Sequence, residues 1–371
     1  MLPIGIDLGN GGIKLVMEGG QLYVPNVTAV GKERVDIGEQ QEALHTLDVQ
    51  IQSPLFGNQT RRFFVGKLAA DQGTLANYMS PADKKSSSEQ ALVLYLTSIA
   101  SAVLKHRERV ETVSTDRTVH EDVFAVSGVS LVEAFERGIR QGFEKRLSGE
   151  HIVTFCSPSK WGGWTVHLNI TAKVVSEGNM AFIALCTNLP TRAKELTSSM
   201  VALAEIGELS TEFPVFEKGS INPSLSTGLQ YGIASTLNNL LDEIREKTGV
   251  RNAFPGGRME LEQLLERRET EVIYMGKRYD IRPYITQHLT AAANYVFQKI
   301  MDKWTAIPSI RYFYVLGGGA ALLHPYLVQL AQKAGMVLEF APTLEQSRWL
   351  NAEGMYLTAQ RLASSTVMNR G

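Results

Sequence analysis

A short sequence pattern occurs in both halves of the chain, and it constrains the fold more than any other feature. The first copy, residues 4–14, reads IGIDLGNGGIK, and the second, residues 201–212, reads VALAEIGELSTE. In each copy an apolar run ends on a carboxylate, Asp7 or Glu205, and a glycine follows two residues later. Each copy then returns to residues typical of a strand and reaches a further turn. Two hairpins of like design predict two lobes of like topology.

The remaining sequence alternates between helical and strand patterns. Ser88 followed by Glu89 is a typical helix start, and apolar residues continue from there at helical spacing. The further expected strands lie at residues 122–129, 151–155, 165–175 and 311–316, and the further expected helices at 131–147, 225–247, 260–268, 281–304 and 346–362. This alternation predicts an α/β protein with mainly parallel sheets. Residues 30–85 and 230–280 interrupt the rhythm and are interpreted as insertions.

The composition of the chain limits the kinds of partner that it can bind. The 371 residues suffice for two domains, and a net charge of -1 gives no overall attraction to nucleic acid or to an anionic membrane. No apolar run approaches the roughly 18 residues of a membrane helix, and the start lacks the basic region of a signal peptide. Cys156 and Cys186 fit neither a metal site nor a disulfide framework and are interpreted as small buried side chains. We therefore expect a cytoplasmic protein.

The first turn has the residues that a polyphosphate needs. Gly9, Gly11 and Gly12 let backbone N–H groups approach phosphate oxygens, Asn10 adds a polar side chain, and Lys14 adds a cation. A single turn of this kind would be an ordinary hairpin, and its duplication is what favours the phosphate interpretation.

Two further features complete the predicted site. Asp7 and Glu205 end their strands, and such sparse carboxylates suit Mg²⁺ held partly through water. A glycine triplet between a strand and a helix leaves room for a base or ribose: Gly317, Gly318 and Gly319. The sequence contains neither a P-loop nor a Rossmann glycine pattern, which disfavours P-loop NTPases and NAD enzymes.

In this order the motifs resemble those of the actin/Hsp70/sugar-kinase superfamily. Residues 7–14 resemble its first phosphate loop, residues 205–212 its second, and residues 316–320 its adenosine loop. Within the superfamily the chain is most similar to the plasmid-segregation actins of bacteria, the ParM/StbA and Alp proteins. Three features carry this: residues 351–356, residues 174–178, and a length that leaves no room for the peptide-binding domain of a chaperone.

The resemblance implies a two-lobed, actin-like fold built from duplicated ribonuclease H-like units, with a nucleotide cleft between the lobes. Lobe I would comprise residues 1–176 and 345–371, and lobe II residues 177–344. The insertions at about 30–85 and 230–280 would form one small subdomain in each lobe.

The same resemblance assigns roles to individual residues. Glu177 and Glu205 would be the catalytic residues, because Glu177 falls where the family places the acid that polarises the attacking water. Its alternative is an ordinary acid in a surface turn. Asp7 and Glu205 would hold the hydrated Mg²⁺ ion. The phosphates of ATP, or of GTP, would contact residues 9–12 and Lys14 on one side and Gly207, Ser210 and Thr211 on the other.

Two departures from the family pattern predict either slow hydrolysis or a second loop of different shape. The second loop usually begins with Asp, and Glu205 is one methylene longer. Leu209 stands where that loop usually has Gly, and a bulky residue resists positive φ. Elsewhere, the aromatics of residues 161–164 are interpreted as local packing or as a partner contact. Lys84–Lys85 and Arg267–Arg268 are interpreted as solvated surface charge.

Three functional hypotheses remain open on the sequence. The first is an ATPase that assembles head to tail into filaments with ATP and Mg²⁺ and disassembles them when the ATP is hydrolysed. It would segregate plasmid DNA through a DNA-binding adaptor, without touching nucleic acid or membrane itself. The second is a small-molecule kinase on the same fold. The third is a scaffold that senses nucleotide without hydrolysing it.

Overall fold

The protein is represented by a computed structural model, which describes residues 1–35, 42–57, 59–79, 83–110, 116–250, 254 and 256–368. Parts of both predicted insertions and the last residues of predicted lobe I lie outside the described residues. The chain divides into two compact units: unit 1 is Met1–Ala184 with Leu350–Gly371, and unit 2 is Leu185–Trp349. Both boundaries fall inside helices, whereas the sequence had placed them at residues 176/177 and 344/345. The nucleotide cleft expected between the lobes stays a prediction.

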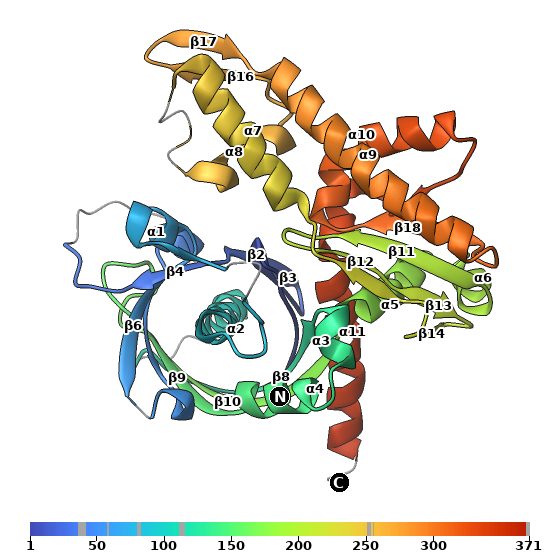
Figure 1. Ribbon diagram of the computed structural model, residues 1–371. Coiled ribbons are helices and arrows are strands. Elements are labelled where there is room, and N and C mark those ends of the chain that lie inside the picture. Colours follow the sequence, from blue (N-terminus) through green and yellow to red (C-terminus); the bar gives the residue numbers. More distant parts are fainter. Residues whose placement is uncertain are drawn as a thin grey trace. The chain divides into compact units, whose positions relative to one another are not determined.

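Unit 1 is built on one curled sheet (Figure 1). Its strands are β1 (Leu2–Leu8), β2 (Gly12–Met17), β3 (Gly20–Pro25), β4 (Val27–Val30), β5 (Asp48–Gln52), β6 (Thr60–Val65), β7 (Asn77–Tyr78), β8 (Thr118–Val129), β9 (Gly149–Phe155) and β10 (Thr165–Ser176). Its helices are α1 (Lys67–Ala70), α2 (Glu89–Arg109), α3 (Leu131–Phe135), α4 (Ile139–Leu147), most of α5 (Glu177–Asn188) and most of α11 (Leu344–Met368), with 3-10 turns at Ala43–His45, Pro54–Phe56 and Gly73–Leu75.

The sheet continues through the first predicted insertion. Within the described residues its ten strands follow the order β3-β2-β1-β8-β10-β9-β5-β6-β4-β7. Strands β5, β6 and β7 come from the predicted insertion, and they extend the same sheet that carries β1. The core of this unit accordingly joins side chains of β1 and β2 to side chains of β5 and β6.

Helix α2 lies inside this curled sheet (Figure 1). Its N-cap is Ser88, whose hydroxyl accepts the backbone N–H of Ala91 at 3.2 Å. Every residue from Gln90 to Leu104 is buried, on all sides of the helix. Such a helix is a central core element, because a helix with one exposed side keeps a polar stripe.

Unit 2 is also built on a sheet, which has fewer strands than the sheet of unit 1. Its strands are β11 (Met200–Ile206), β12 (Thr211–Phe213), β13 (Val215–Glu217), β14 (Ser220–Ile221), β15 (Thr227–Leu229), β16 (Glu271–Tyr274), β17 (Lys277–Asp280), β18 (Tyr312–Leu316) and β19 (Glu339–Phe340). Its helices are α6 (Ala193–Ser198), α7 (Ile233–Thr248), α8 (Gly257–Glu266), α9 (Arg282–Ala306) and α10 (Gly318–Lys333).

The predicted duplication is confirmed by the strand pairings. The order β3-β2-β1-β8-β10 in unit 1 corresponds to β14-β13-β11-β18-β19 in unit 2. In both units the first two pairings are antiparallel and the last two are parallel. Pro214 divides the return strand of unit 2 into β12 and β13, yet its carbonyl still accepts the N–H of Leu203 at 2.9 Å.

Three expectations for individual elements are wrong. Most strand pairings among the described residues are antiparallel, and many of them join strands connected by a hairpin rather than by a crossover helix. The helix expected at residues 131–147 is divided into α3 and α4 by Gly138, which has a φ of +84°. Helix α7 begins at Ile233 rather than near residue 225, because β15 pairs with β12 first. Among the described residues, every helix is too short or too polar to cross a lipid bilayer.

Candidate functional site

The β1–β2 loop brings the predicted residues of unit 1 together. Asp7 and Lys14 are partners in the strand register, and the Lys14 Nζ lies 3.4 Å from the buried Asp7 Oδ2. A Cβ added to Gly9 would lie 2.6 Å from the Gly12 carbonyl oxygen and 3.4 Å from the Lys14 Nζ. Glycine therefore keeps an open cradle beside a cation and a carboxylate, and these are the groups that a phosphate with Mg²⁺ requires.

Side chains that the sequence analysis missed hold this loop in place. The Tyr23 hydroxyl donates to the Gly11 carbonyl at 3.3 Å. A Cβ on Gly12 would lie 2.3 Å from the Tyr23 ring, so the ring lies directly against the loop backbone. Buried Asn26 donates its side-chain amide to the Gly9 carbonyl at 2.9 Å and its backbone N–H to the Gly11 carbonyl at 3.3 Å.

Asn26 is in turn fixed by the enclosed helix. The Gln90 amide in the first turn of α2 donates to the Asn26 Oδ1 at 2.7 Å. The sequence signal of this support is an asparagine within the largely apolar residues 22–30.

Glu177 lies at the same sheet edge as Asp7. The strands β1, β8 and β10 are parallel neighbours, and Asp7, Gly128 and Glu177 stand near or just after their carboxyl ends. A Cβ on Gly128 would lie 2.7 Å from the Glu177 Cγ, so the acid lies directly over this glycine. Burial raises the pKa of Glu177 above its ordinary value; Lys85 opposes the rise, and the carboxylate of Asp7 adds to it.

The position of Lys85 shows that its predicted place on the surface was wrong. Lys84 and Lys85 were both expected on the surface, and Lys84 is indeed half exposed. Lys85 is buried, and its Nζ lies 2.5 Å from the Glu177 Oε1. Nothing in the local sequence distinguishes the two lysines, because the partner lies ninety-two positions away.

The second loop repeats the first in unit 2. Glu205 occupies the position of Asp7, and its register partner is Glu212 where the first loop has Lys14. The Gly207 N–H donates to the Ser210 carbonyl at 2.9 Å, and a Cβ on Gly207 would lie 3.0 Å from that same oxygen. Leu209 does not adopt a positive φ, so the loop passes this bulky residue without a left-handed backbone conformation.

Helix α7 secures the second loop. The N–H groups of Ile233 and Ala234 donate to the carbonyls of Gly207 and Glu208 at 3.0 and 2.9 Å. The predicted phosphate ligand Thr211 is fully buried, and its hydroxyl donates to the Tyr231 carbonyl at 2.7 Å. Thr211 therefore supports the loop from inside the unit, whereas Gly207 and Ser210 lie in the loop itself.

The glycine triplet meets this loop within unit 2. Leu316 is the register partner of Glu205, and Gly317 follows with a φ of +94°. A Cβ on Gly317 would lie 2.5 Å from the Ile206 carbonyl oxygen, and one on Gly319 would lie 2.4 Å from the Ile206 Cγ2. The triplet is therefore required for the close approach of helix α10 to the end of β11.

A charged cluster that the sequence analysis missed borders the second loop. Arg258 on α8 pairs with Glu208 at 2.7 Å, and Arg348 pairs with Glu262 at 3.0 Å and with Glu266. Burial raises the pKa of Glu262 to about 7; Glu208 adds to the rise, and Arg348 opposes it. The cluster fixes α8 beside the loop and the glycine triplet.

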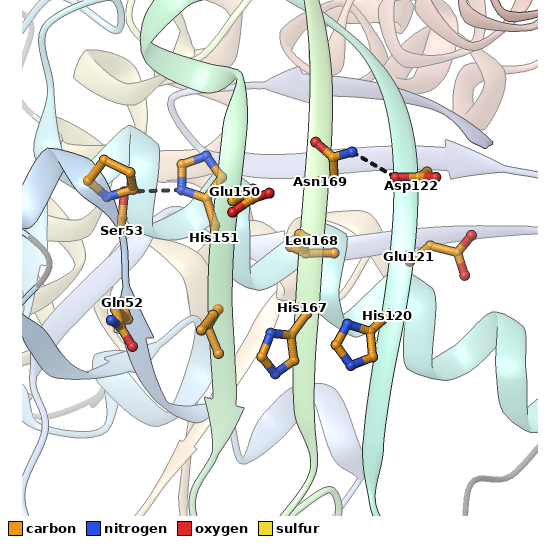
Figure 2. A pocket seen from close by; sticks show the side chains of 12 residues that line it. Gln52, Ser53, His120, Glu121, Asp122, Glu150, His151, His167, Leu168 and Asn169 are labelled. Atoms are coloured by element: carbon orange, nitrogen blue, oxygen red, sulfur yellow. Dashed lines mark hydrogen bonds between the residues drawn. The ribbon is translucent and has the colours of Figure 1, made fainter.

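A separate concave surface lies elsewhere in unit 1, on β5, β8, β9 and β10, and the pocket that it lines has a volume of about 630 Å³ (Figure 2). His120 and His167 stack there with ring centroids 4.4 Å apart, and Asn169 donates to Asp122 at 2.8 Å. At roughly 3.3 Å per residue, His120 is about 26 Å along β8 from Gly128. Among the described residues, no three His, Cys, Asp or Glu side chains are placed to hold a metal. This surface is therefore distinct from the Asp7–Glu177 edge.

Two family models match the sequence. Residues 5–179 match the N-terminal domain of actin like proteins, and residues 203–329 match the C-terminal part of the archaeal actin homologue, MreB-like. A search of the curated proteins found no match.

Solved structures give the same fold. The structure of actin-like protein Alp7A superposes with a TM-score of 0.78 at 16% identity, covering 99% of this chain and 98% of that one. Bacillus thuringiensis ParM with ATP gives 0.73 at 18% identity, covering 98% and 99%. The archaeal actin homologue Ta0583 gives 0.72 at 19% identity, covering 97% and 100%. The predicted two-domain, mixed α/β actin-like fold is confirmed, and residues 5–179 and 203–329 match the models of two actin-like domains.

Proposed function

We propose that the protein binds ATP with Mg²⁺, hydrolyses it slowly and assembles head to tail into filaments. The observation that carries this proposal is the duplicated hairpin loop, in which a carboxylate and a glycine two residues later recur at the same register positions of both units. Two comparisons support it. ParM of Bacillus thuringiensis has been solved with ATP, ADP and AMPPNP, and a variant of pCBH ParM is described as non-polymerisable.

Each loop contributes different groups to the proposed site. In unit 1, Asp7 would hold the hydrated Mg²⁺ while Lys14 and the backbone of residues 9–12 bind phosphate. In unit 2, Glu205 would serve the metal, and Gly207 and Ser210 the phosphate, with Thr211 supporting the loop. The glycine triplet at residues 317–319 would contact the nucleoside. The Mg²⁺ ion would supply positive charge to the phosphate oxygens.

Glu177 is the proposed acceptor of the proton from the attacking water. It lies over Gly128 at the edge that carries Asp7, and its side chain is buried. A carboxylate in such a place acts as a base when it is ionised and within reach of the water.

The proposed cellular role is plasmid or DNA segregation in the cytoplasm. Its support is the resemblance of residues 351–356 and 174–178 to the plasmid-segregation branch. A net charge of -1 gives the chain no overall affinity for DNA, so the proposal includes a DNA-binding adaptor. Comparing ATP with GTP in every assay would establish the preferred nucleotide.

Phosphate release and light scattering on the full chain test the proposal. With Mg²⁺ and ATP, the wild type is expected to scatter light and to pellet, and EDTA is expected to prevent both. Glu177→Gln is expected to assemble but to release phosphate at least about 10²-fold more slowly, because the proton acceptor is lost. Asp7→Asn is expected to bind Mg²⁺-ATP more weakly.

The matched control is Glu150→Gln, which neutralises an exposed acid of unit 1 on the separate concave surface. It should behave as the wild type. A chain that sediments as a monomer at high concentration with and without nucleotide would contradict assembly. Equal phosphate release by wild type and Glu177→Gln would contradict the role of this acid.

A further inference from the structure

The turn before α2 contacts several elements of unit 1 through consecutive residues. Lys84 pairs with Glu136 just after α3 at 2.9 Å, and Lys85 pairs with Glu177 at the start of α5 at 2.5 Å. The Ser86 hydroxyl donates to Glu133 within α3 at 2.7 Å. Arg146 on α4 also donates to the Ser86 carbonyl at 3.0 Å, so the backbone of this turn is fixed as well.

The Lys85–Glu177 pair differs from its neighbours in being buried on both sides. Both side chains are about nine-tenths buried, whereas Lys84 and Glu136 are half exposed. Removing two charges from water is costly, and an apolar pair of the same volume is often as stable or more stable. Stability alone is therefore a weak reason for a buried lysine at this position.

The surroundings of Glu177 oppose its ionisation. The carboxylates of Asp7 on β1 and Glu133 on α3 act on it, and burial disfavours its charged form. Gly128 and the Met355 methyl group of α11 add no charge on their sides. Lys85, whose Nζ lies 2.5 Å from the Glu177 Oε1, is the cation that opposes these effects and favours the ionised carboxylate.

We propose that Lys85 is a positioning residue that holds the Glu177 carboxylate ionised and fixed at the Asp7 edge, ready to accept a proton from the attacking water. This inference rests on the proposed ATPase function. In the step itself, the water oxygen forms a bond to the terminal phosphorus, and the bond from that phosphorus to the bridging oxygen breaks. The electron pair of that bond stays on the ADP oxygen, the water proton passes to Glu177, and Lys85 keeps its proton throughout.

The test compares Lys85→Met with Lys84→Met in the full chain, so that adjacent lysines act as variant and matched control. Nucleotide affinity is measured with a fluorescent ATP analogue, and phosphate release is measured from pH 5.5 to 9. Lys85→Met is expected to bind nucleotide within about threefold of the wild type and to release phosphate at least about tenfold more slowly at pH 7. The pH at which its rate rises should be higher than in the wild type, because Glu177 loses the positive charge of Lys85 that favours its ionisation. Lys84→Met should match the wild type.

Two further variants separate positioning from mere stability. Lys85→Arg keeps the charge and should regain most of the rate, and it remains informative if Lys85→Met does not fold. Lys85→Met/Glu177→Gln should unfold at a higher temperature than Lys85→Met, since no unpaired buried acid remains. A purely structural lysine would lower the unfolding temperature without moving the pH profile.

The outcomes distinguish this inference from the proposed function. If wild type hydrolyses ATP, Glu177→Gln does not, and Lys85→Met keeps the wild-type rate and pH profile, the inference is wrong and the function stands. If Glu177→Gln matches the wild type, the role of the acid and of its lysine are both wrong. Absence of any phosphate release from the wild type overturns the function and the inference together.

Discussion

Tyr23 shows how a single side chain can set the shape of a glycine loop. Its ring lies against Gly12, where a Cβ would come within 2.3 Å of ring carbon atoms. The requirement for glycine at this position is steric, because Gly12 does not adopt a positive φ. A substitution there would displace either the ring or the loop that carries the Gly11 carbonyl.

Gly12→Ala is therefore expected to weaken ATP binding about tenfold, which corresponds to about 1.4 kcal/mol. Gly12→Ala/Tyr23→Ala should regain most of that loss, since the truncated side chain leaves room for the added methyl. Titration with a fluorescent nucleotide measures both. Gly20→Ala is the control, because no atom lies within 4 Å of its added Cβ. Equal affinities for Gly12→Ala and Gly20→Ala would contradict the steric account.

At the scale of single residues, the sequence predicts which residues lie at the candidate site better than it predicts the contacts that hold them there. Asp7, Gly9 and Lys14 lie together because residues 7–14 belong to one hairpin. The partners of Asn26 and Lys85 come from segments far along the chain, and the hairpin pattern contains no information about them. The loop around Leu209 needs no positive φ at that position, and the residue type alone did not show which backbone conformation the loop would adopt.

Helix α11 is held against unit 1 by backbone contact. A Cβ on Gly5 of β1 would lie 2.2 Å from the Tyr356 N, and one on Gly354 would lie 2.0 Å from the Met180 carbonyl oxygen. Met180 belongs to the first turn of α5, which begins at Glu177. The small residues within 351–356 therefore allow α11 to fix the helix that carries the proposed catalytic acid.

Gly354→Ala is expected to destabilise the folded protein by at least about 1–3 kcal/mol, the usual cost of overpacking a close contact. The contact atoms are backbone and cannot move aside independently. Gly142→Ala on α4 is the matched control, because its added Cβ meets nothing within 4 Å and alanine favours a helix. Urea unfolding measures both variants. Equal midpoints would show that the α5–α11 crossing tolerates a methyl group.

Elements with clear end signals were predicted well, and elements defined by pairing were not. Ser88 and the apolar spacing after it correctly predicted the start of α2. The break at Gly138 follows from the left-handed conformation of one glycine, whereas the short strand β15 depends on its pairing with β12, which the local sequence does not specify. The predominance of antiparallel pairs was missed because the alternation of elements does not show which strands are joined as hairpins.

Each unit of the molecule has its own apolar core, and a buried histidine lies in unit 1. His151 contacts the Ser53 hydroxyl at 3.0 Å. Burial lowers its pKa to about 4, and the nearby carbonyls of Leu147 and Ser148 only partly oppose this. The unfolded chain therefore takes up a proton at this residue before the folded chain does.

The free energy of unfolding is expected to fall as the pH drops from about 6.5 to about 4. The contribution of His151 is about 3 kcal/mol over that range, from a shift of about 2.5 units at 1.36 kcal/mol each. His151→Asn should remove that part of the pH dependence in denaturant titrations. His45→Asn, at a half-exposed histidine, should leave it unchanged. An identical acid profile for wild type and His151→Asn would contradict the assignment.

The enclosure of α2 by its sheet also has a consequence for the nascent chain while it is being synthesised. Residues 89–109 leave the ribosome before β8, β9 and β10, which complete the surroundings of this helix, have been made. During that interval its apolar sides face water, and such a segment tends to associate with other nascent chains. We therefore expect the nascent chain to be most prone to association in the interval before residue 176 has been made.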